Sequence, residues 1–510
     1  MAKPSDMELA EATAERISHE VSVGQQHQDI LPDHEVTWDG PDDPANPYNW
    51  PSRRKITVGI VCSASQLVTT MSASMVAPAL DKILADLHMS PTAGQVAFSV
   101  FFLGLGFAPF LIAALAETYG RRSVWIGGNI CYIIWNTLCP VGLSPAVMII
   151  SRFMSGAGAS VGITLTAPVL ADMYPAKKRG RSMAIASLLP YIGPALGPII
   201  GGLAAQNLWW PWLFWILSIF DTFWLVLGFF LIQETYAPVL LQRKAKATGA
   251  LPSTTAKEAF SAAKITAAVK DVSSKVGPAV MRSVKILVRR PIIQLLALAT
   301  AVEFGFYTFV LSTFASLWIN KYGQTETQAS LHYISIALGA FVCAQAGGQL
   351  MDFIWRRMKA ARPNSEPTPE YRVPYMVFSL VPSTAGAFWY AWAAEKHVAW
   401  IVVDVGVFFM EIGGFMYNQS LMAYMIDEVS STRAASGSAA TRILSYIFGF
   451  TFPLFAPRLY DQLGYGWGTS LLGFLTLALT GPVPFVLWFW GDKIRAIGRT
   501  PEDEKERVVE

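Results

Sequence analysis

The chain has 510 residues, of which 53% are apolar and only 15% are charged. In soluble globular domains about a quarter of all residues are charged, so this composition excludes an ordinary soluble protein. The high apolar content also excludes a mostly disordered chain. The net charge of +3 is too small to indicate nucleic-acid binding. The six His are scattered and the four Cys fall in apolar stretches, so we expect no metal site, no cofactor and no disulfide framework.

Long apolar stretches are the dominant feature of the chain. A helix that crosses the roughly 30 Å hydrocarbon core of a bilayer needs about 20 apolar residues. Twelve stretches meet this requirement, and they lie near 57–79, 95–114, 124–143, 146–168, 183–205, 211–233, 292–317, 328–350, 373–393, 398–421, 435–458 and 468–490. The first begins too late for a cleavable signal peptide. The sequence therefore predicts an all-α polytopic membrane protein.

The basic residues gather on one side of the predicted membrane. Of the 39 Lys and Arg, 33 fall in the two termini or in the connections that follow even-numbered spans. The positive-inside rule assigns this side to the cytoplasm, and an even number of spans also puts both termini on one side. We therefore expect both termini in the cytoplasm. The membrane is expected to be the plasma membrane, with the vacuolar membrane as the alternative.

The spans form two groups of six, separated by a long polar stretch. The expected organisation is a mostly disordered cytoplasmic tail at 1–56, a six-helix bundle at 57–233, a linker at 234–290, a second six-helix bundle at 291–490 and a cytoplasmic tail at 491–510. Within the linker, apolar residues recur at helical spacing from Ile265 to Val284 among several Lys. This pattern predicts an amphipathic helix on the anionic inner leaflet, and a simple tether between the halves is the alternative.

One short motif occurs twice, directly after the second span of each half. Both copies read Leu-x-acid-x-x-x-Arg-Arg, and matching positions in two halves indicate an internal repeat. The residues concerned are Glu117, Gly120, Arg121 and Arg122 in the first copy and Asp352, Arg356 and Arg357 in the second. An acid at a helix end with an Arg pair four residues on can tie two helices together through charge-assisted bonds. We expect these residues to take part in gating.

With this repeat, the chain resembles the major facilitator superfamily. The first copy is similar to that family's signature between spans 2 and 3, with Ala113 where Gly is usual and Glu117 where Asp is usual. Further stretches resemble family motifs: Arg152–Gly158 in span 4, Asp172–Arg181 in the next loop, Gly193–Gly202 in the antiporter signature of span 5, and Trp38–Trp50 and Glu234–Pro238 in the fungal twelve-span drug:proton antiporters. The resemblance covers about residues 38–495. It implies two six-helix bundles and a group that includes multidrug, polyamine and secondary-metabolite exporters.

The glycines of span 5 also have a direct physical interpretation. Gly193, Gly197 and Gly201 recur every four residues, so they share one helix face and permit close approach of a neighbouring helix. Pro194 and Pro198 each remove a backbone donor and bend the helix. A bent, closely packed helix at the interface of the halves could seal one side while the other opens. Plain helix packing is the alternative.

Ionisable residues inside spans cost about 2.5–3.5 kcal/mol each to insert, so each one is a functional candidate. Six are present: Arg152, Asp221, Glu303, Asp404, Glu411 and Arg442. Glu303 and Glu411 lie in the middle of spans 7 and 10, which line the central cavity in the resembled family. We expect them to couple transport to protons, with hydrogen-bonded helix packing as the alternative. Arg152 matches an Arg that the family implicates in proton coupling, with a buried structural partner for a carboxylate as the alternative. Asp221 is a further candidate, although its span is usually peripheral and a structural role is the alternative.

Aromatic and amide side chains near these carboxylates are candidates for the substrate cavity. Phe304 and Tyr307 flank Glu303, and Tyr417 and Asn418 follow Glu411. Together with Gln66 of span 1, they could line a cavity for a flat, amphipathic compound. Core packing is the alternative for any single aromatic residue.

These observations predict a proton-coupled membrane transporter that exports a toxin, drug or secondary metabolite by alternating access. The expected partners are a small-molecule substrate, protons and the lipid bilayer, with no nucleic acid, and a monomer suffices because one chain holds both halves. Uptake or export of a specific polar metabolite, such as a polyamine or organic acid, and a non-transporting nutrient sensor are the alternatives. An enzyme is not expected, and the chain has no GxxxxGK[ST] loop for ATP.

Overall fold

The computed structural model describes residues 37–174, 186, 188–248, 274, 276–278, 280–281, 284–362, 368–428 and 431–497. Within these residues every regular element is helical. The predicted tail up to residue 36, most of the amphipathic stretch of the linker, residues 175–185 of the loop after span 4 and the end of the chain from residue 498 lie outside the described residues.

The first bundle contains six long helices, which correspond in order to the first six predicted spans. They are α2 (Ser52–Ser74), α4 (Pro91–Tyr119), α5 (Arg121–Leu138), α6 (Pro145–Met173), α8 (Leu188–Asn207) and α9 (Trp212–Leu231). Two short elements, η2 (Ala77–Ala79) and α3 (Leu80–Asp86), connect α2 to α4, and α10 (Ala237–Ala247) follows the bundle. Helix α2 packs against α6, α8 and α9, and α6 also packs against α4 and α5.

The second bundle contains the other six predicted spans, two of which are divided into shorter helices. Its elements are α13 (Pro291–Ser316), η3 (Leu317–Lys321), α14 (Glu326–Leu331), α15 (Tyr333–Val342), η4 (Cys343–Gly347), α16 (Gly348–Ala361), α17 (Val373–Glu395), α18 (Trp400–Glu428), α19 (Ser431–Leu454), α20 (Ala456–Thr480) and α21 (Pro482–Ala496). Span 8 is the run from α14 to α16. Span 12 is the later part of α20, after a break at Gly464, together with α21.

Eight helices of the described part are long and apolar enough to cross a membrane by length and composition. They correspond to predicted spans 1, 2, 4, 6, 7, 8, 10 and 12. The remaining four spans are α5, α8, α17 and α19, and each of them packs along one or more of these eight helices. The predicted all-α fold with twelve spans in two bundles is confirmed.

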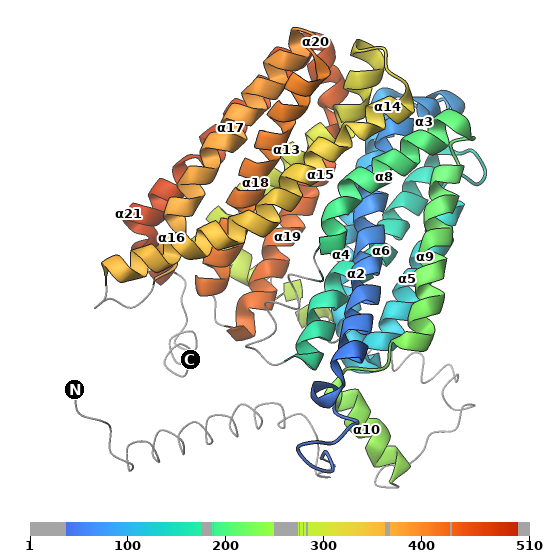
Figure 1. Cartoon of the computed structure of the whole chain (residues 1–510), viewed down its shortest axis with the longest axis vertical. Coiled ribbons are helices and arrows are strands. Elements are labelled where there is room, and N and C mark those ends of the chain that lie inside the picture. The colour runs from blue at the N-terminus through green and yellow to red at the C-terminus, as the bar shows by residue number, and fades with distance from the viewer. Residues whose placement is uncertain are drawn as a thin grey trace.

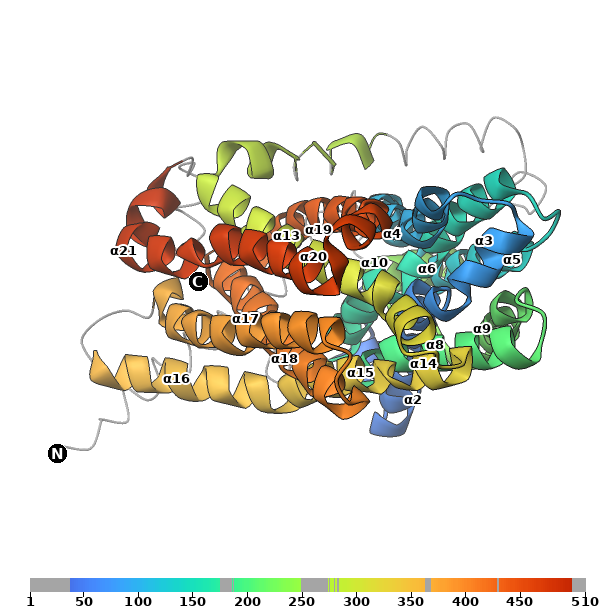
Figure 2. The same ribbon diagram turned by 90° about the horizontal axis from the view of Figure 1, so that it is seen from above.

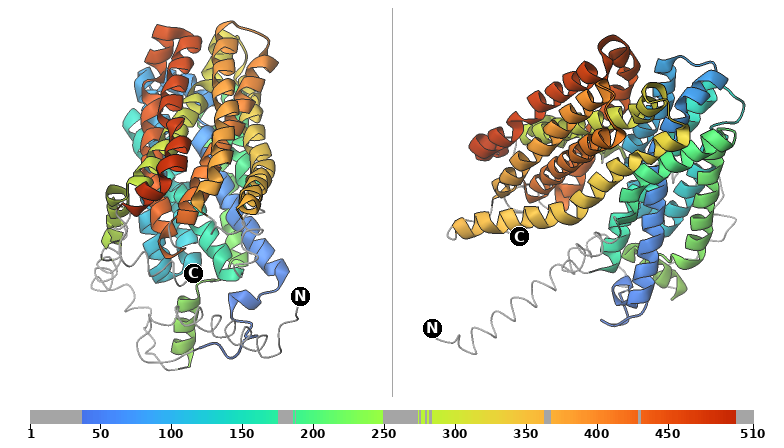
Figure 3. Two further views of the ribbon diagram at one scale, coloured as in Figure 1. Left: turned by 90° about the vertical axis from the view of Figure 1, so that its left-hand side faces the viewer. Right: turned by 45° about the horizontal axis from the view of Figure 1, so that its top comes forward.

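The two bundles lie side by side, and their axes diverge toward one end (Figures 1 and 2). We call this end the α10 end, because α10 lies beyond it (Figure 3, left). The opposite end, where α3 and α14 lie next to each other, is the α3 end (Figure 1). Contacts between the bundles join α4 to α19, α8 to α14 and α15, and η2 to α13 and α14.

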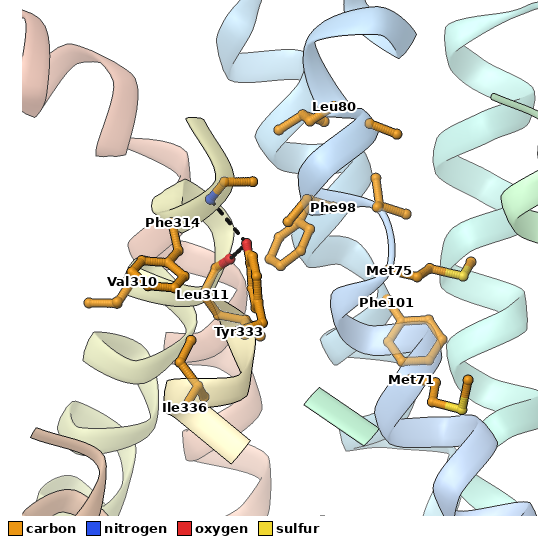
Figure 4. Packing of buried hydrophobic residues seen from close by; sticks show 14 of the residues in the cluster. Met71, Met75, Leu80, Phe98, Phe101, Val310, Leu311, Phe314, Tyr333 and Ile336 are labelled. Carbon is orange, nitrogen blue, oxygen red and sulfur yellow. Dashed lines mark hydrogen bonds between the residues drawn. The ribbon is translucent and has the colours of Figure 1, made fainter. Parts of the chain in front are cut away.

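A single hydrophobic cluster extends across both bundles. Met71, Met75 and Phe101 of the first bundle and Phe314 and Tyr333 of the second all belong to it (Figure 4). All five side chains are at most 2% exposed. Apolar packing therefore joins the two bundles, and it holds them together from their middle toward the α3 end.

Local sequence signals explain where the helices of the repeated motif begin and end. Helix α4 starts after Ser90, whose hydroxyl accepts a hydrogen bond from the N–H of Ala93. It ends at Gly120, which has a φ of +93° that favours glycine, so α5 can start at the next residue. In the second copy of the motif Trp355 takes the place of Gly120, and α16 continues through the Arg pair without a break.

Candidate functional site

Glu303 and Glu411 both lie in the interior of the second bundle. Their residues are 6% and 5% exposed, on α13 and α18. Gly339 of α15 makes room for Glu411, because a Cβ there would lie 2.8 Å from the Cβ of Glu411, and Gly414 of α18 lies next to Glu303, since a Cβ there would be in ordinary contact with its Oε2 at 3.5 Å. The two carboxylates are close enough for their charges to interact. The structure therefore brings these two predicted residues together.

Glu303 borders a small cavity, of a size to hold about one water molecule. The cavity lies among α13, α17 and α20, and its polar lining consists of Glu303, Ser383, Thr384, Thr476 and Thr480. Glu303 thus faces the inside of its own bundle rather than the other bundle. Among the described residues, neither Glu303 nor Glu411 has a cationic side chain within 4.0 Å of its carboxylate, the limit for an ion pair.

Tyr417 and Asn418 occupy different environments. Tyr417 is fully buried and its hydroxyl donates a hydrogen bond of 2.8 Å to the carbonyl of Thr480, so it packs against α20. Asn418, the next residue on α18, is half-buried. Gln66, on α2 of the first bundle, is also half-buried. The two half-buried amides have the partial exposure that a cavity lining requires.

Aromatic rings from both bundles meet in the middle of the molecule. Phe102 of α4 lies with its ring centre 5.7 Å from that of Phe304 of α13, which in turn lies 6.0 Å from Tyr307 and 5.4 Å from Tyr446 of α19. We call these four residues the inter-bundle aromatic cluster. Gly449 leaves room for it, because a Cβ there would lie 2.6 Å from the ring of Phe304.

A second aromatic pair joins the bundles at Tyr191 of α8 and Phe415 of α18, with ring centres 5.5 Å apart. Phe304 and Tyr307 were predicted from the sequence to line a cavity, whereas their partners Phe102 and Tyr446, and this second pair, were not. Aromatic residues are too frequent in the spans for their positions alone to single these residues out.

Arg152 is fully buried in the first bundle, on α6. Its guanidinium donates to the carbonyl of Ser72 at 3.1 Å and, at 3.4 Å, to the Ser72 hydroxyl and the carbonyl of Ala97. It also lies 4.5 Å from the ring centre of Phe101. Among the described residues, no carboxylate lies within 4.0 Å of it, so the charge is held by neutral acceptors and an aromatic face.

Asp221 of α9 is 1% exposed and points into the first bundle. Its Oδ2 has no hydrogen-bond partner among the described residues. The side chain is near enough to Tyr132 of α5 for an electrostatic interaction, and Tyr132 also interacts with Arg152. The structure therefore brings Asp221 and Arg152 to the same tyrosine, separate from the carboxylates of the second bundle.

The first copy of the repeated motif forms a polar cluster at the α10 end. Glu234 accepts hydrogen bonds from the backbone N–H groups of Arg121 and Arg122, at 2.8 and 3.3 Å, and so caps the start of α5. The guanidinium of Arg121 pairs with Asp172 of α6 at 3.4 Å. Gly120 is required here, since a Cβ would lie 2.2 Å from Glu234. Glu117 is exposed.

The second copy is arranged differently. Asp352 lies 3.7 Å from Arg372, while Arg356 donates to the carbonyl of Asp352 within its own helix and Arg357 lies over the ring of Phe353. None of the residues of α16 is buried. The two copies therefore match in sequence but differ in structure, because only the first contains a glycine that turns the chain.

A buried ion-pair network in the second bundle escaped the sequence analysis. Arg290, before α13, pairs with Glu428 of α18 at 2.5 Å, and Arg495 of α21 pairs with Glu428 at 3.6 Å and with Glu370 at 2.9 Å. Tyr424 donates a further hydrogen bond to Glu370. These residues sit at the ends of spans, where charges are common, so their positions in the sequence gave no signal of burial.

The glycines of α8 pack against α2 of the same bundle. A Cβ at Gly193 would lie 1.9 Å from the Thr70 hydroxyl, and at Gly197 and Gly201 it would lie 2.3 and 2.1 Å from backbone carbonyls of α2. Pro194 and Pro198 lie inside α8, between these glycines. The next glycine, at position 202, faces the carbonyl of Glu326 in the other bundle. The face formed by Gly193, Gly197 and Gly201 therefore packs inside the first bundle, whereas the adjacent Gly202 contacts the second bundle.

Polar contacts join the bundles at the α3 end. Lys82 pairs with Glu326 of α14 at 2.8 Å and also donates to the carbonyl of Ala205. The Gln206 side chain accepts a hydrogen bond of 3.0 Å from the N–H of Thr327, and Asn320 donates to Asp81. Among the described residues, every ion pair and hydrogen bond between the bundles lies at this end.

Comparisons with known proteins agree with this architecture. The family model of the Major Facilitator Superfamily matches residues 62–453. The chain is 35% identical to the probable efflux pump mfs2 of Aspergillus flavus, over 82% of this chain and 98% of that protein, and 33% identical to the efflux pump vrtL of Penicillium aethiopicum, over 91% of each. A solved bacterial homologue of the human lysosomal transporter Spinster, in an inward-facing and unoccupied conformation, matches with a TM-score of 0.60 at 14% identity, over 89% of this chain and all of that chain.

Proposed function

The chain belongs to the Major Facilitator Superfamily, and on that premise we propose that it is a proton-coupled exporter of small, flat organic molecules. Its relatives named as efflux pumps support an exporter, and family membership places the protein among transporters rather than enzymes. The proposed partners are one small-molecule substrate, protons and the bilayer, with a monomer as the working unit.

The pair of buried carboxylates, Glu303 and Glu411, carries the proton-coupling part of this proposal. Two carboxylates that lie close together, away from water and without a cation, do not readily both carry a negative charge. A proton bound by the pair would relieve this repulsion, and solvent reaching the pair during the cycle would let that proton leave. The pair is thus suited to bind and release one proton for each transport cycle.

The inter-bundle aromatic cluster supports a flat aromatic substrate. Four rings from both bundles meet there, and aromatic faces bind planar apolar or cationic molecules. Tyr307 links the two sites, because its ring packs on Phe304 of the cluster while its hydroxyl interacts electrostatically with Glu411. Asn418 and Gln66, both half-buried, are proposed to supply hydrogen bonds to the substrate.

Alternating access is the proposed mechanism, and this structure is proposed to be its cytoplasm-open state. The bundles diverge toward the α10 end (Figure 1), and the polar contacts between them that involve described residues lie at the α3 end. The excess of Lys and Arg in the connections at the α10 end supports a cytoplasmic location for that end and for both termini. The cluster of Arg121, Asp172 and Glu234 would then brace the cytoplasmic ends of α4, α5 and α6 as the bundles move.

Reconstituted vesicles provide the test. The full chain in proteoliposomes with an acidic lumen should accumulate ethidium, a planar aromatic cation, and should lose this gradient-driven accumulation when Glu303→Gln or Glu411→Gln is introduced. Asp461→Asn, which changes an exposed carboxyl in α20, is the matched control and should accumulate ethidium like the wild type. Neutral and anionic aromatic probes define the preferred charge of the substrate.

Two results would contradict the proposal. Movement of every probe that ignores the pH gradient would indicate facilitated diffusion. Gradient-driven movement that survives both Glu→Gln changes would transfer the coupling role to Arg152 and Asp221 in the first bundle.

A further inference from the structure

A second pair of buried ionisable groups lies at the α3 end, apart from Glu303 and Glu411. His332, between α14 and α15, places its Nδ1 2.7 Å from Oδ2 of Asp404 on α18. Its Nε2 lies 2.9 Å from Oε1 of Gln324, and the indole of Trp318 stacks on the imidazole at 3.6 Å between ring centres. Both His332 and Asp404 are 9% exposed. The imidazole is therefore fixed on both edges and on one face.

This geometry requires a shared proton. The 2.7 Å contact between Nδ1 of His332 and Oδ2 of Asp404 needs a proton, either on the ring or on the carboxyl, because an unprotonated nitrogen would face a carboxylate lone pair. The Gln324 amide can meet Nε2 with its oxygen or with its nitrogen, so it completes the site whichever group carries that proton. The other oxygen of Asp404 is buried and has no hydrogen-bond partner among the described residues. A free acceptor beside a shared proton is the arrangement of a site that passes protons on.

Polar groups connect this pair to the carboxylates in the middle of the bundle. Asp404 and Glu411 are seven residues apart on α18, which places them on one face about 10.5 Å apart along the axis. Two tyrosines lie near these groups: Tyr307 interacts electrostatically with both Glu411 and Tyr333, and Tyr333 directly follows His332 in the chain. The hydroxyl of Tyr333 is held between two backbone groups of α13, accepting from the N–H of Ala315 and donating to a carbonyl one turn away (Figure 4).

We propose that His332 and Asp404 form a proton-loading site at the α3 end of a relay that runs inside the second bundle to Glu411 and Glu303. This inference rests on the proposed function. Opening of the α3 end separates α14 from the first bundle and exposes the pair to solution. A proton then binds the pair, passes to the carboxylates along the part of the bundle that Tyr333 and Tyr307 occupy, and leaves when the α10 end is open. The proton and the substrate thus follow different routes, one inside a bundle and one between the bundles.

Side chains from every packed element surround the pair. Tyr322, after η3, interacts electrostatically with Asp404 and packs against His397, which follows α17, and the ring of Trp400 on α18 faces the imidazole. Glu326 on α14 and Tyr333 on α15 are the nearest ionisable residues along the chain on either side of His332. Glu326 is already paired with Lys82. Asp404 is the group in direct contact with His332, so the two belong to one proton-binding unit.

The test separates proton coupling from substrate movement. Asp404→Asn and His332→Gln, each in the full chain in proteoliposomes, are compared with the wild type, Glu411→Gln and the exposed control Asp461→Asn. Two rates are measured: accumulation of radiolabelled ethidium driven by an acidic lumen, and exchange of labelled for unlabelled ethidium at equal pH. We expect both relay variants to slow the driven rate by about tenfold or more while exchange stays within about twofold of wild type, and the dependence of the driven rate on lumenal pH to flatten.

Each outcome is decisive. Wild-type driven rates in both Asp404→Asn and His332→Gln, with Glu411→Gln uncoupled, would overturn the relay and leave the proposed function standing. Equal losses of driven movement and exchange in both variants would overturn it in favour of a structural ion pair. A wild type that shows no gradient-driven movement of ethidium, or of the neutral and anionic probes, would overturn both proposals together.

Discussion

Replacing Glu326 with Gln should loosen the contact between the two bundles at the α3 end. The ion pair between Lys82 and Glu326 spans 2.8 Å, and the two side chains are 43% and 20% exposed. Partly solvated pairs of this kind contribute about 0.2–1 kcal/mol, so the ratio of α3-closed to α3-open molecules should fall by about 1.4-fold to 5-fold. Lys82 keeps its hydrogen bond to Ala205, which limits the effect.

A reversed charge gives a larger and more specific effect. In Glu326→Lys, repulsion between two ammonium groups near 4 Å adds about 1 kcal/mol, which raises the expected change to about 7-fold to 30-fold. Spin labels at Leu208 and Leu331, exposed positions on either side of this contact, report the two populations as a distance distribution. The native cysteines are first replaced.

The controls decide whether charge is the cause. The double variant Lys82→Glu with Glu326→Lys should restore the wild-type distribution, and high salt should reduce the effect of each single change because the pair is partly solvated. A distribution that stays the same in Glu326→Lys at low salt would refute the reasoning. So would a swapped double variant that remains as open as the single ones, since the apolar cluster alone would then hold the bundles together.

Three further predictions concern stability. Glu428→Gln leaves the buried guanidinium of Arg290 without its carboxylate and should cost about 3–5 kcal/mol, seen as a lower thermal midpoint in detergent; an unchanged midpoint would contradict a structural role for this pair. Gly201→Ala should cost about 1–3 kcal/mol because its Cβ would overlap the end of α2, whereas Gly127→Ala, with open space around it inside α5, should leave the midpoint unchanged or slightly raised because Ala favours a helix more than Gly does. Hydrogen bonds from two backbone N–H groups, and to a smaller extent the charge of Lys244 on α10, lower the pKa of Asp43, which lies in the segment before α2. The stabilising effect of the Asp43 carboxylate is therefore complete above about pH 4, and it is lost only as the pH falls through the lowered pKa. Hydrogen exchange of that segment, corrected for intrinsic rates, should therefore show equal protection at about pH 7 and about pH 5, and a loss between these values would count against Asp43 as its anchor.

The segment before α2 illustrates what a sequence motif can and cannot specify. The Trp38–Trp50 stretch was identified from the sequence as a family feature, but the sequence did not indicate that this stretch binds to α10. Asp43 accepts hydrogen bonds from two backbone N–H groups, and Lys244 of α10 pairs with Asp39 at 2.7 Å. These residues are about 200 positions apart in the chain, and neither lies in a pattern that names the other.

The candidate site residues likewise include some that the sequence identified and some whose contacts only the structure identifies. The sequence identified Glu303 and Glu411 because a carboxylate in the middle of a span is costly and therefore conspicuous. It did not identify the relation between Asp404 and His332, since a histidine beside a predicted span and an aspartate near the end of another are both compatible with contact with water. The glycine face of α8 was recognised as a packing surface, yet only the structure identifies α2 as its partner.

The sequence by itself determined the class of protein, the number and order of the spans and the resemblance to a family, because a bilayer forces every spanning segment to be a long apolar helix with its backbone bonded internally. Tertiary structure alone decided which face of each helix is inside and which buried charges meet. The physical reason is that lipid is as apolar as the interior of a bundle, so hydropathy does not distinguish a lipid-facing side chain from a packed one. Contacts such as Arg290 with Glu428 join residues far apart in the chain, and only the folded bundle brings them together.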